Sequence, residues 1–304
     1  MATQTISTSH ASEPGGTGTP EFRKPKSSVG DKVVGSISHG VLVIWSIIVV
    51  VPLLWTVLSS FKTSSEIFDA PFALPSVWRF ENYLHAWTDS KIGGAFLNTV
   101  IVVGCALVLV MLLGSMCAYV LARFKFPGSR AIYIAMLAGL TFPVFLAIVP
   151  LFGILQSLGL LGTHVGLILV FTAFALPFTV FFLFSFFKSL PFEIAEAAAI
   201  DGAGEWRTFF QVMLPMARPG LASVAILNFV GLWNQYVLAV ALNAKYPENR
   251  LLSQALGAFA TGANYNVDYG SLFAAVVITV VPVLIVYVIF QRQLQGSVSQ
   301  GTMK

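Results

Sequence analysis

The longest uncharged stretch of the chain limits what it can fold into. Between Ala131 and Phe187 there are 57 residues without a single Lys, Arg, Asp or Glu. One helical pass through a bilayer takes about 20 residues, so this stretch predicts two passes joined by a short turn. Glycines and polar residues around 156–166 place that turn. We therefore predict an all-α polytopic membrane protein.

The remaining sequence extends this prediction to six transmembrane helices. The chain is 57% hydrophobic and only 10% charged, whereas a typical soluble domain is about 25% charged. The other four predicted spans are 37–59, 94–121, 220–243 and 271–290. Together they form one transmembrane domain over 35–295. Residues 1–34 are rich in Ser, Thr, Gly and Pro, which predicts a disordered tail, and 296–304 form a second tail.

Basic residues orient these spans. With both termini in the cytoplasm, twelve Lys and Arg residues lie inside and five lie outside, which agrees with the positive-inside rule. The five outer residues are Lys62, Arg79, Lys91, Lys245 and Arg250. This distribution explains the net charge of +4 without a nucleic-acid partner. The two cysteines, Cys105 and Cys117, share one span and have neither disulfide nor metal-site spacing.

A polar stretch, 188–219, interrupts the apolar second half on the predicted cytoplasmic face. Its first part predicts a short helix, because Pro191 suits a helix start and Glu193 and Glu196 suit its positive end. Alanines then follow, and Asp201-Gly202 ends the helix. Gly202 is expected to set the direction of the turn, and Asp201 to cap the next helix or form an Asx turn.

A second short helix is predicted after the glycine turn. Four apolar residues recur at helical spacing and predict one buried stripe, and Pro215 and Pro219 are expected to end the helix. The stripe consists of Trp206, Phe209, Phe210 and Met213. Because a helix of this length is marginal in water, packing must hold it.

This polar stretch resembles the EAA loop of the membrane subunits of ABC importers. Glu196-Ala197-Ala198, then Gly202, then nine residues and Val212-Met213-Leu214-Pro215 match that pattern, except that Val212 replaces the family's Ile. The resemblance implies the type I ABC importer permease fold. It also implies a coupling helix that docks on a cytoplasmic ABC ATPase dimer. The implied coupling residues are Glu196, Ala197, Ala198, Asp201, Gly202, Leu214 and Pro215.

Three further segments look like carbohydrate-type ABC permeases and extend the resemblance over about 35–295. They are Leu121–Gly128, Ser60–Ile67 and Trp233–Tyr236. The resemblance implies a multi-pass subunit of a bacterial cell membrane that imports a sugar or oligosaccharide. Its implied partners are a second homologous permease, an extracellular or lipid-anchored solute-binding protein and membrane lipid. The chain has no phosphate-binding loop, so ATP and Mg are expected in the partner ATPase, with no cofactor, metal or catalytic residue here.

Polar side chains inside the spans have two interpretations. In hydrocarbon they need partners, so they either join helices or line a solute path where amides bind sugar hydroxyls and aromatic rings stack on the sugar. The residues concerned are Asn98, Thr99, Trp233, Asn234, Gln235 and Tyr236. Aromatic residues in the outer segments 62–91 and 245–269 likewise mark either the membrane interface or a platform for the binding protein.

Three other functions are alternatives to sugar import. An ion-coupled secondary transporter usually needs ionisable residues inside the membrane, and no predicted span has one near its middle. A membrane-embedded enzyme would need a convergent group of His, Asp, Glu or Cys, which the spans do not offer. An ABC permease for a non-sugar solute would carry the same EAA loop and stays open at this point.

Overall fold

A computed structural model describes residues 29–261 and 267–301, and every regular element in them is helical. Internal contacts divide the chain into two units, 1–52 and 53–304, which we describe separately. The first unit holds most of α1 (Val29–Ser59), which begins before the predicted boundary at residue 35. The rest of the predicted N-terminal tail, 1–28, lies outside the described residues.

Helix α1 is apolar on all of its sides. Its side chains from Ile37 to Leu54 are mostly exposed, Trp45 among them at 65%. Its apolar part, Gly35–Ser59, is 25 residues long, enough to cross a bilayer. A helix that is hydrophobic all round requires lipid or protein on every side, as predicted for the first span.

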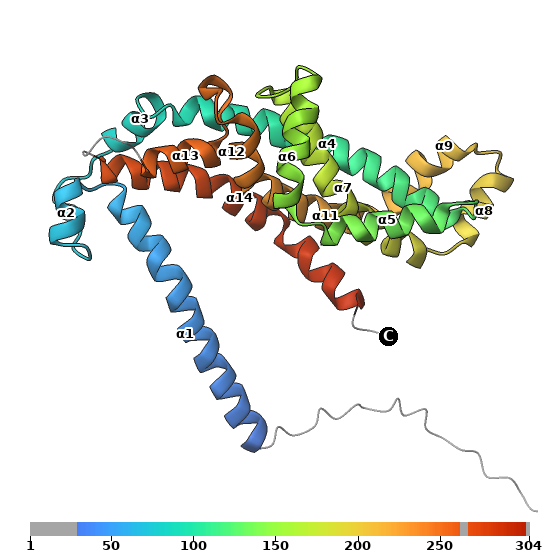
Figure 1. Cartoon of the computed structure of the whole chain (residues 1–304). Coiled ribbons are helices and arrows are strands. Elements are labelled where there is room, and N and C mark those ends of the chain that lie inside the picture. Colours follow the sequence, from blue (N-terminus) through green and yellow to red (C-terminus); the bar gives the residue numbers. More distant parts are fainter. Residues whose placement is uncertain (1–28, 262–266, 302–304) are drawn as a thin grey trace, which may run out of the picture. The chain divides into compact units, whose positions relative to one another are not determined.

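Two long helices form the frame of the second unit. Helix α4 (Ile92–Arg123) and α7 (His164–Ser189) lie side by side (Figure 1). Their contact is close because Gly114 has no side chain: a Cβ atom there would lie 2.5 Å from Cγ2 of Thr179. Helix α11 (Arg218–Trp233) packs against both, and α14 (Tyr269–Gly301) packs on α11. Helix α14 continues into the predicted C-terminal tail, of which 302–304 lie outside the described residues.

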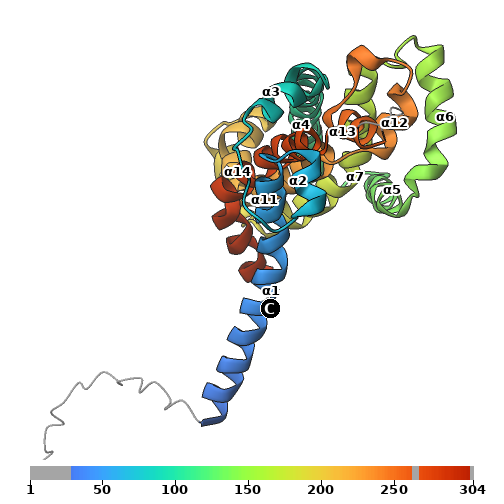
Figure 2. The same cartoon turned by 90° about the vertical axis from the view of Figure 1, so that its left-hand side faces the viewer.

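Two of the predicted spans are broken. The first half of the uncharged stretch forms α5 (Ser129–Thr141) and α6 (Val144–Ser157), which are bent by 106° at Phe142-Pro143. The bend arises because proline holds the preceding residue in extended backbone, and Phe142 has φ −70° and ψ 121°. The predicted fifth span, 220–243, breaks after Trp233 and resumes as α12 (Val237–Asn243), which packs against α6 (Figure 2).

The number of spans depends on how these bends are counted. Within the described residues, four continuous helices are long and apolar enough to cross a membrane. Two bent helix pairs raise the number to six if each pair is one span; the second pair joins Glu205–Met216 to Arg218–Trp233 at 77°. Six spans are therefore compatible with the structure by length and composition, but the second pair includes Glu205–Met216, which belongs to the predicted cytoplasmic loop.

Two apolar clusters hold the second unit together. The first surrounds the front half of α4 and includes Phe171 and Trp233. The second surrounds the end of α4 and includes Tyr119 and Phe187. Four short segments join α7 to α11 beside this second cluster: α8 (Glu193–Ile200), α9 (Glu205–Arg207), the π-helical turn η1 (Thr208–Met213) and α10 (Leu214–Met216).

The opposite end of α4 carries the outer segments. They contain α2 (Ser64–Asp69), α3 (Glu81–Thr88), the short turn η2 (Pro247–Asn249) and α13 (Leu252–Ala260). Lys62 is fully buried there, and its Nζ donates hydrogen bonds to the carbonyls of Ala70 and Pro71, both at 3.1 Å. Asn82 donates its amide to the carbonyls of Ser60 and Lys62. These bonds fix the backbone of the outer loop after α1.

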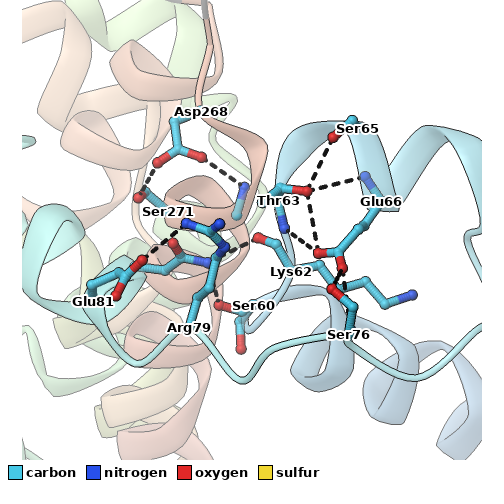
Figure 3. Close-up of polar contacts among 12 residues, drawn as sticks. Ser60, Lys62, Thr63, Ser65, Glu66, Ser76, Arg79, Glu81, Asp268 and Ser271 are labelled. Carbon is cyan, nitrogen blue, oxygen red and sulfur yellow. Dashed lines mark hydrogen bonds and ion pairs between the residues drawn. The ribbon is translucent and has the colours of Figure 1, made fainter.

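Glu66 fastens the same outer loop at two points (Figure 3). It forms a capping box with Thr63, whose backbone N–H donates to Oε2 of Glu66 at 2.9 Å. The backbone N–H and hydroxyl of Ser76 donate to the other carboxylate oxygen. The hydrogen bond from the Ser76 side chain and those from Thr63 lower the pKa of Glu66 from 4.5 to about 2.

We expect this carboxylate to stabilise the outer loop in a pH-dependent way. Because its folded pKa is depressed, the stabilisation is complete above pH 4.5 and is lost as the pH falls toward about 2. Thermal unfolding of the purified protein should therefore show Glu66→Gln less stable than wild type at pH 7, with a difference that shrinks below pH 4.5. Glu81→Gln, which removes an exposed ion pair with Arg79, is the control. A constant difference down to low pH would contradict this role.

Candidate functional site

Helix α8 is the predicted short helix of the polar stretch, and its end has a defined geometry. The N–H of Gly202 donates to the Ala199 carbonyl at 3.0 Å, and that of Ala203 donates to the Ala198 carbonyl at 2.9 Å. These two bonds form a Schellman motif, which requires a left-handed residue after the helix. Gly202 supplies it with φ +78°. The predicted glycine turn is therefore confirmed, and Asp201 is the C-cap of α8.

The second helix differs from its prediction in three ways. Gly204, not Asp201, occupies its N-cap position. The predicted single stripe is wrong, because Phe209 and Met213 are buried whereas Trp206 and Phe210 are exposed. The π-helical turn η1 changes the angle between successive residues, so Trp206 and Phe210 stack on each other on another side.

The two prolines lie on either side of the end of this helix. The continuous helical segment Glu205–Met216 ends one residue after Pro215, as predicted, and Pro219 lies in the first turn of α11. Proline is favoured in a first helical turn because its missing N–H has no partner there anyway. Only Pro219 begins a helix, whereas Pro215 lies in the last turn of the continuous segment Glu205–Met216, and Leu214 is partly buried against the second cluster.

The loop 188–219 is anchored on the end of α4. The ring of Tyr119 lies 5.0 Å from that of Phe209 and 5.6 Å from that of Phe187. Met213 is fully buried in the same cluster. Fixing a short helix in this way compensates for its low stability in isolation. The position of α8 thus depends on α4 and α7.

One face of α8 is left uncovered by the described residues. Ala198 is buried against the loop, whereas Glu196, Ala197 and Ala199 are exposed. Ile200, at the end of the helix, is 86% exposed. The predicted coupling residues thus divide into an inward and an outward set.

Arg123 joins the end of α4 to the loop; from the sequence it was one of the cytoplasmic charges and part of the segment Leu121–Gly128. Its Nη2 donates to the Leu190 carbonyl at 2.8 Å, and its guanidinium lies over the Phe192 ring at 5.8 Å. It borders a hollow of about 250 Å³ that Glu196 and Glu205 also line. Its place as the last residue of a long helix was the available signal.

We expect Arg123 to transmit movement between α4 and α8. Hydrogen bonds to charged groups contribute about 1.5–3 kcal/mol, so Arg123→Gln should lower the transport-linked ATPase rate of the assembled transporter by roughly tenfold. Arg123→Lys should be intermediate, since lysine lacks the planar fork. Lys125→Gln, at an exposed neighbouring position, is the matched control. An equal loss in both Gln variants would indicate a general charge effect.

A second hollow lies between α7 and α11. It measures about 270 Å³ and its wall contains Phe171, Phe174, Asn228 and Gln235. The Asn228 amide donates to Oγ1 of Thr179 at 2.7 Å. Gln235 was a predicted path residue, whereas Asn228 was not, because a single amide in an apolar run gave no distinctive signal.

The other predicted path residues near the break after α11 have different surroundings. Trp233 is buried and donates its indole N–H to the Thr279 carbonyl at 3.1 Å. Asn234 donates back to the Val230 carbonyl in its own turn. Tyr236 is 47% exposed and lies beside Gly257.

Asn98 and Thr99 lie far from the hollow between α7 and α11, near the outer end of α4. The Asn98 amide donates to the carbonyls of Glu248 and Arg250, and the hydroxyl of Thr99 accepts from the Leu252 N–H at 2.7 Å. These bonds attach the segment 247–252 to α4. The structure therefore does not bring the six predicted path residues to one place.

Comparison with known proteins decides the family. Residues 110–300 match the model of the binding-protein-dependent transport system inner membrane component. The chain belongs to this family. It is a membrane component of a bacterial ABC importer, located in the inner membrane, and ATP hydrolysis belongs to a separate subunit. The ion-coupled alternative has no support from this family.

Individual relatives of this transport component cover most of the chain. A diacetylchitobiose uptake system permease protein from Streptomyces coelicolor is 65% identical over 90% of both chains. A trehalose transport system permease protein from Mycobacterium tuberculosis is 33% identical over 83% of this chain and 92% of its own. One chain of a bacterial ABC transporter involved in import of the acidic polysaccharide alginate has a similar fold, with a TM-score of 0.76. Its identity is 23%, over 88% of this chain and 99% of that chain.

Proposed function

We propose that this chain is the sugar-translocating permease of a heteromeric importer. A second homologous permease completes the pathway, and an extracellular or lipid-anchored binding protein delivers the sugar. ATP binding closes a cytoplasmic ATPase dimer and moves α8, which turns the pathway outward, and hydrolysis returns it inward. ATP and Mg bind to the ATPase.

The exposed end of α8 carries this proposal. A large apolar side chain, Ile200, is 86% exposed beside the small Ala197 and Ala199. Small side chains let another surface approach closely, and the isoleucine then fills a depression in it. The Schellman motif and the buried Ala198 hold this face rigid. A cleft on the ATPase suits such a face. Glu196, at the edge of this face, can pair with a cation or accept a hydrogen bond from an N–H group of the ATPase.

The hollow between α7 and α11 supports a neutral sugar as the solute. Asn228 and Gln235 provide amide donors and acceptors, and the other residues lining the hollow are apolar, without a charged side chain among them. Phenylalanine rings suit the C–H face of a pyranose. An acidic or basic solute would leave its charge unpaired there. The sugars named for the similar permeases are in keeping with this chemistry.

Co-purification tests the ATPase contact. We would tag the chain, extract its complex in mild detergent and compare Ile200→Asp with Phe72→Asp. Phe72 is 84% exposed but lies in the outer loop, so it is a matched control for an exposed apolar residue. We expect the ATPase to be lost with Ile200→Asp and retained with Phe72→Asp. Retention in both variants would contradict docking through α8.

Uptake into proteoliposomes tests the solute class. The complete transporter with its binding protein is given ATP and radiolabelled diacetylchitobiose, trehalose or methionine. We expect ATP-dependent uptake of at least one of the sugars and none of methionine. Uptake of methionine alone would favour the remaining alternative, a permease for a non-sugar solute.

A further inference from the structure

A third hollow lies at the outer end of α4, away from both sites described above. It measures about 520 Å³, which is within the usual range for small-molecule sites. We call it the outer pocket and define it by six lining residues: Trp87, Lys91, Asn98, Glu248, Arg250 and Phe259. Four of them come from α3, α4, η2 and α13, whereas Lys91 directly precedes α4 and Arg250 directly follows η2. The sequence predictions above touch its residues singly, Asn98 as a possible path residue and the others as part of the outer segments, but they do not predict a pocket.

The aromatic wall of the outer pocket is fixed in position. Trp87 is 41% exposed and packs against Phe96, with ring centroids 5.7 Å apart. It also lies on Gly93, where a Cβ atom would come within 2.6 Å of the indole ring. A tryptophan held in this way keeps one part of its ring available to the pocket.

The polar part of the pocket is also built into the fold. The Asn98 amide holds the carbonyls of Glu248 and Arg250 at 2.9 and 3.0 Å, which fixes the backbone of both residues. Lys91 has φ 57° and is the one non-glycine residue with positive φ in the described part of the chain. Strained backbone of this kind tends to occur at functional sites. Neither Lys91 nor Arg250 forms an ion pair with a described carboxylate.

We propose that the outer pocket transiently binds one sugar unit of the solute between its release from the binding protein and its entry into the membrane pathway. Trp87 offers a flat apolar surface to the C–H face of a pyranose. Lys91 and Arg250 donate hydrogen bonds to hydroxyl or acetamido oxygens, and Glu248 accepts from hydroxyl groups. A rim with both donors and acceptors matches a neutral polyol. This inference rests on the proposed function, since it takes the solute to be a sugar.

Saturation-transfer NMR on the complete transporter in lipid nanodiscs, without the binding protein, tests this site. Diacetylchitobiose is the probe. We expect ring-proton signals in wild type that fall about tenfold in Trp87→Ala and are largely retained in Trp87→Phe. Trp78→Ala is the control, because Trp78 is a half-exposed outer tryptophan that packs on Phe61 instead. Signals that persist in Trp87→Ala but vanish in Gln235→Ala would place the sugar in the hollow between α7 and α11 and overturn the inference.

Two further variants keep the test valid if Trp87→Ala disturbs folding. Lys91→Gln and Arg250→Gln leave the aromatic packing and the Asn98 hydrogen bonds intact, since those bonds use backbone carbonyls. Each should raise the KM for uptake by about tenfold with little change in the maximal rate. Unchanged KM in both variants would overturn the inference.

Failure of the inference can be told apart from failure of the proposed function. If the wild-type transporter imports sugar with its binding protein but gives no signal with free sugar, the outer pocket is not a sugar site. If Trp87→Ala instead weakens only the docking of the binding protein, the pocket receives protein and the inference is wrong. If wild type imports no sugar at all, the proposed function itself fails.

Discussion

Replacing Gly202 with alanine should reduce ATP-driven uptake by roughly tenfold, whereas the same change at Gly204 should have little effect. A Cβ atom meets nothing within 4 Å at either position, so the comparison removes steric clash as a cause. The two glycines differ in backbone conformation: Gly202 has φ +78° and Gly204 has φ −69°. A left-handed residue with a side chain costs about 1–2 kcal/mol, which corresponds to a factor of about 5–30.

The identity of the substituent at Gly202 provides a sharper test. Asparagine adopts the left-handed conformation more readily than alanine, and β-branched residues adopt it least. Uptake should therefore be highest in Gly202→Asn, lower in Gly202→Ala and lowest in Gly202→Val. The amount of ATPase that co-purifies should follow the same order if the turn directs α8. Equal losses at Gly202 and Gly204 would show that the backbone angle is not what matters.

Gly114→Ala should destabilise the second unit by about 1–3 kcal/mol through overpacking of α4 against α7. The added Cβ would lie 2.5 Å from Cγ2 of Thr179, a fully buried residue. Neither helix yields easily, because Thr179 also accepts a hydrogen bond from Asn228. Gly104→Ala, on the same helix with nothing within 4 Å, should be neutral or slightly stabilising. Thermal unfolding in detergent measures both changes.

A double-mutant cycle tests the proposed cause of this loss. Thr179→Ser removes Cγ2 but keeps the hydroxyl that accepts from Asn228. The double variant Gly114→Ala/Thr179→Ser should be more stable than the sum of the two single effects predicts. Additive losses would mean that the helices do not clash at this contact and that Gly114 matters for another reason.

The sequence predicted the helices well where neighbouring residues in the chain determine them. The uncharged 57-residue stretch indicated membrane spans, and Gly202 indicated the end of α8. The bend at Phe142-Pro143 was harder to predict, because a proline within an apolar run is compatible with either a kinked helix or a break. The π-helical turn at 208–213 left no recognisable pattern, so the burial of Phe210 was predicted wrongly.

Contacts between segments that lie far apart in the chain could not be predicted from the sequence. Arg123 and Leu190 are 67 residues apart, and their hydrogen bond depends on how α4 and α7 pack. Asn98 was predicted as either a path residue or a helix contact, and it contacts residues about 150 positions away. An asparagine that lines a solute path and one that joins two helices look the same in the sequence. Only the fold shows which partner such a residue has.

The length and continuity of α4 have a mechanical consequence. This helix has 32 residues and no proline, with the outer pocket at its first turn and Arg123 at its last. At 1.5 Å per residue, each half is about 24 Å long, so a tilt of about 5° displaces the two ends by about 2 Å in opposite directions. A rigid helix transmits such a movement from one end to the other without side-chain rearrangements in between. If the proposed ATPase contact rotates the inner end of α4, its outer end moves with it, and binding at the outer pocket in turn shifts Arg123.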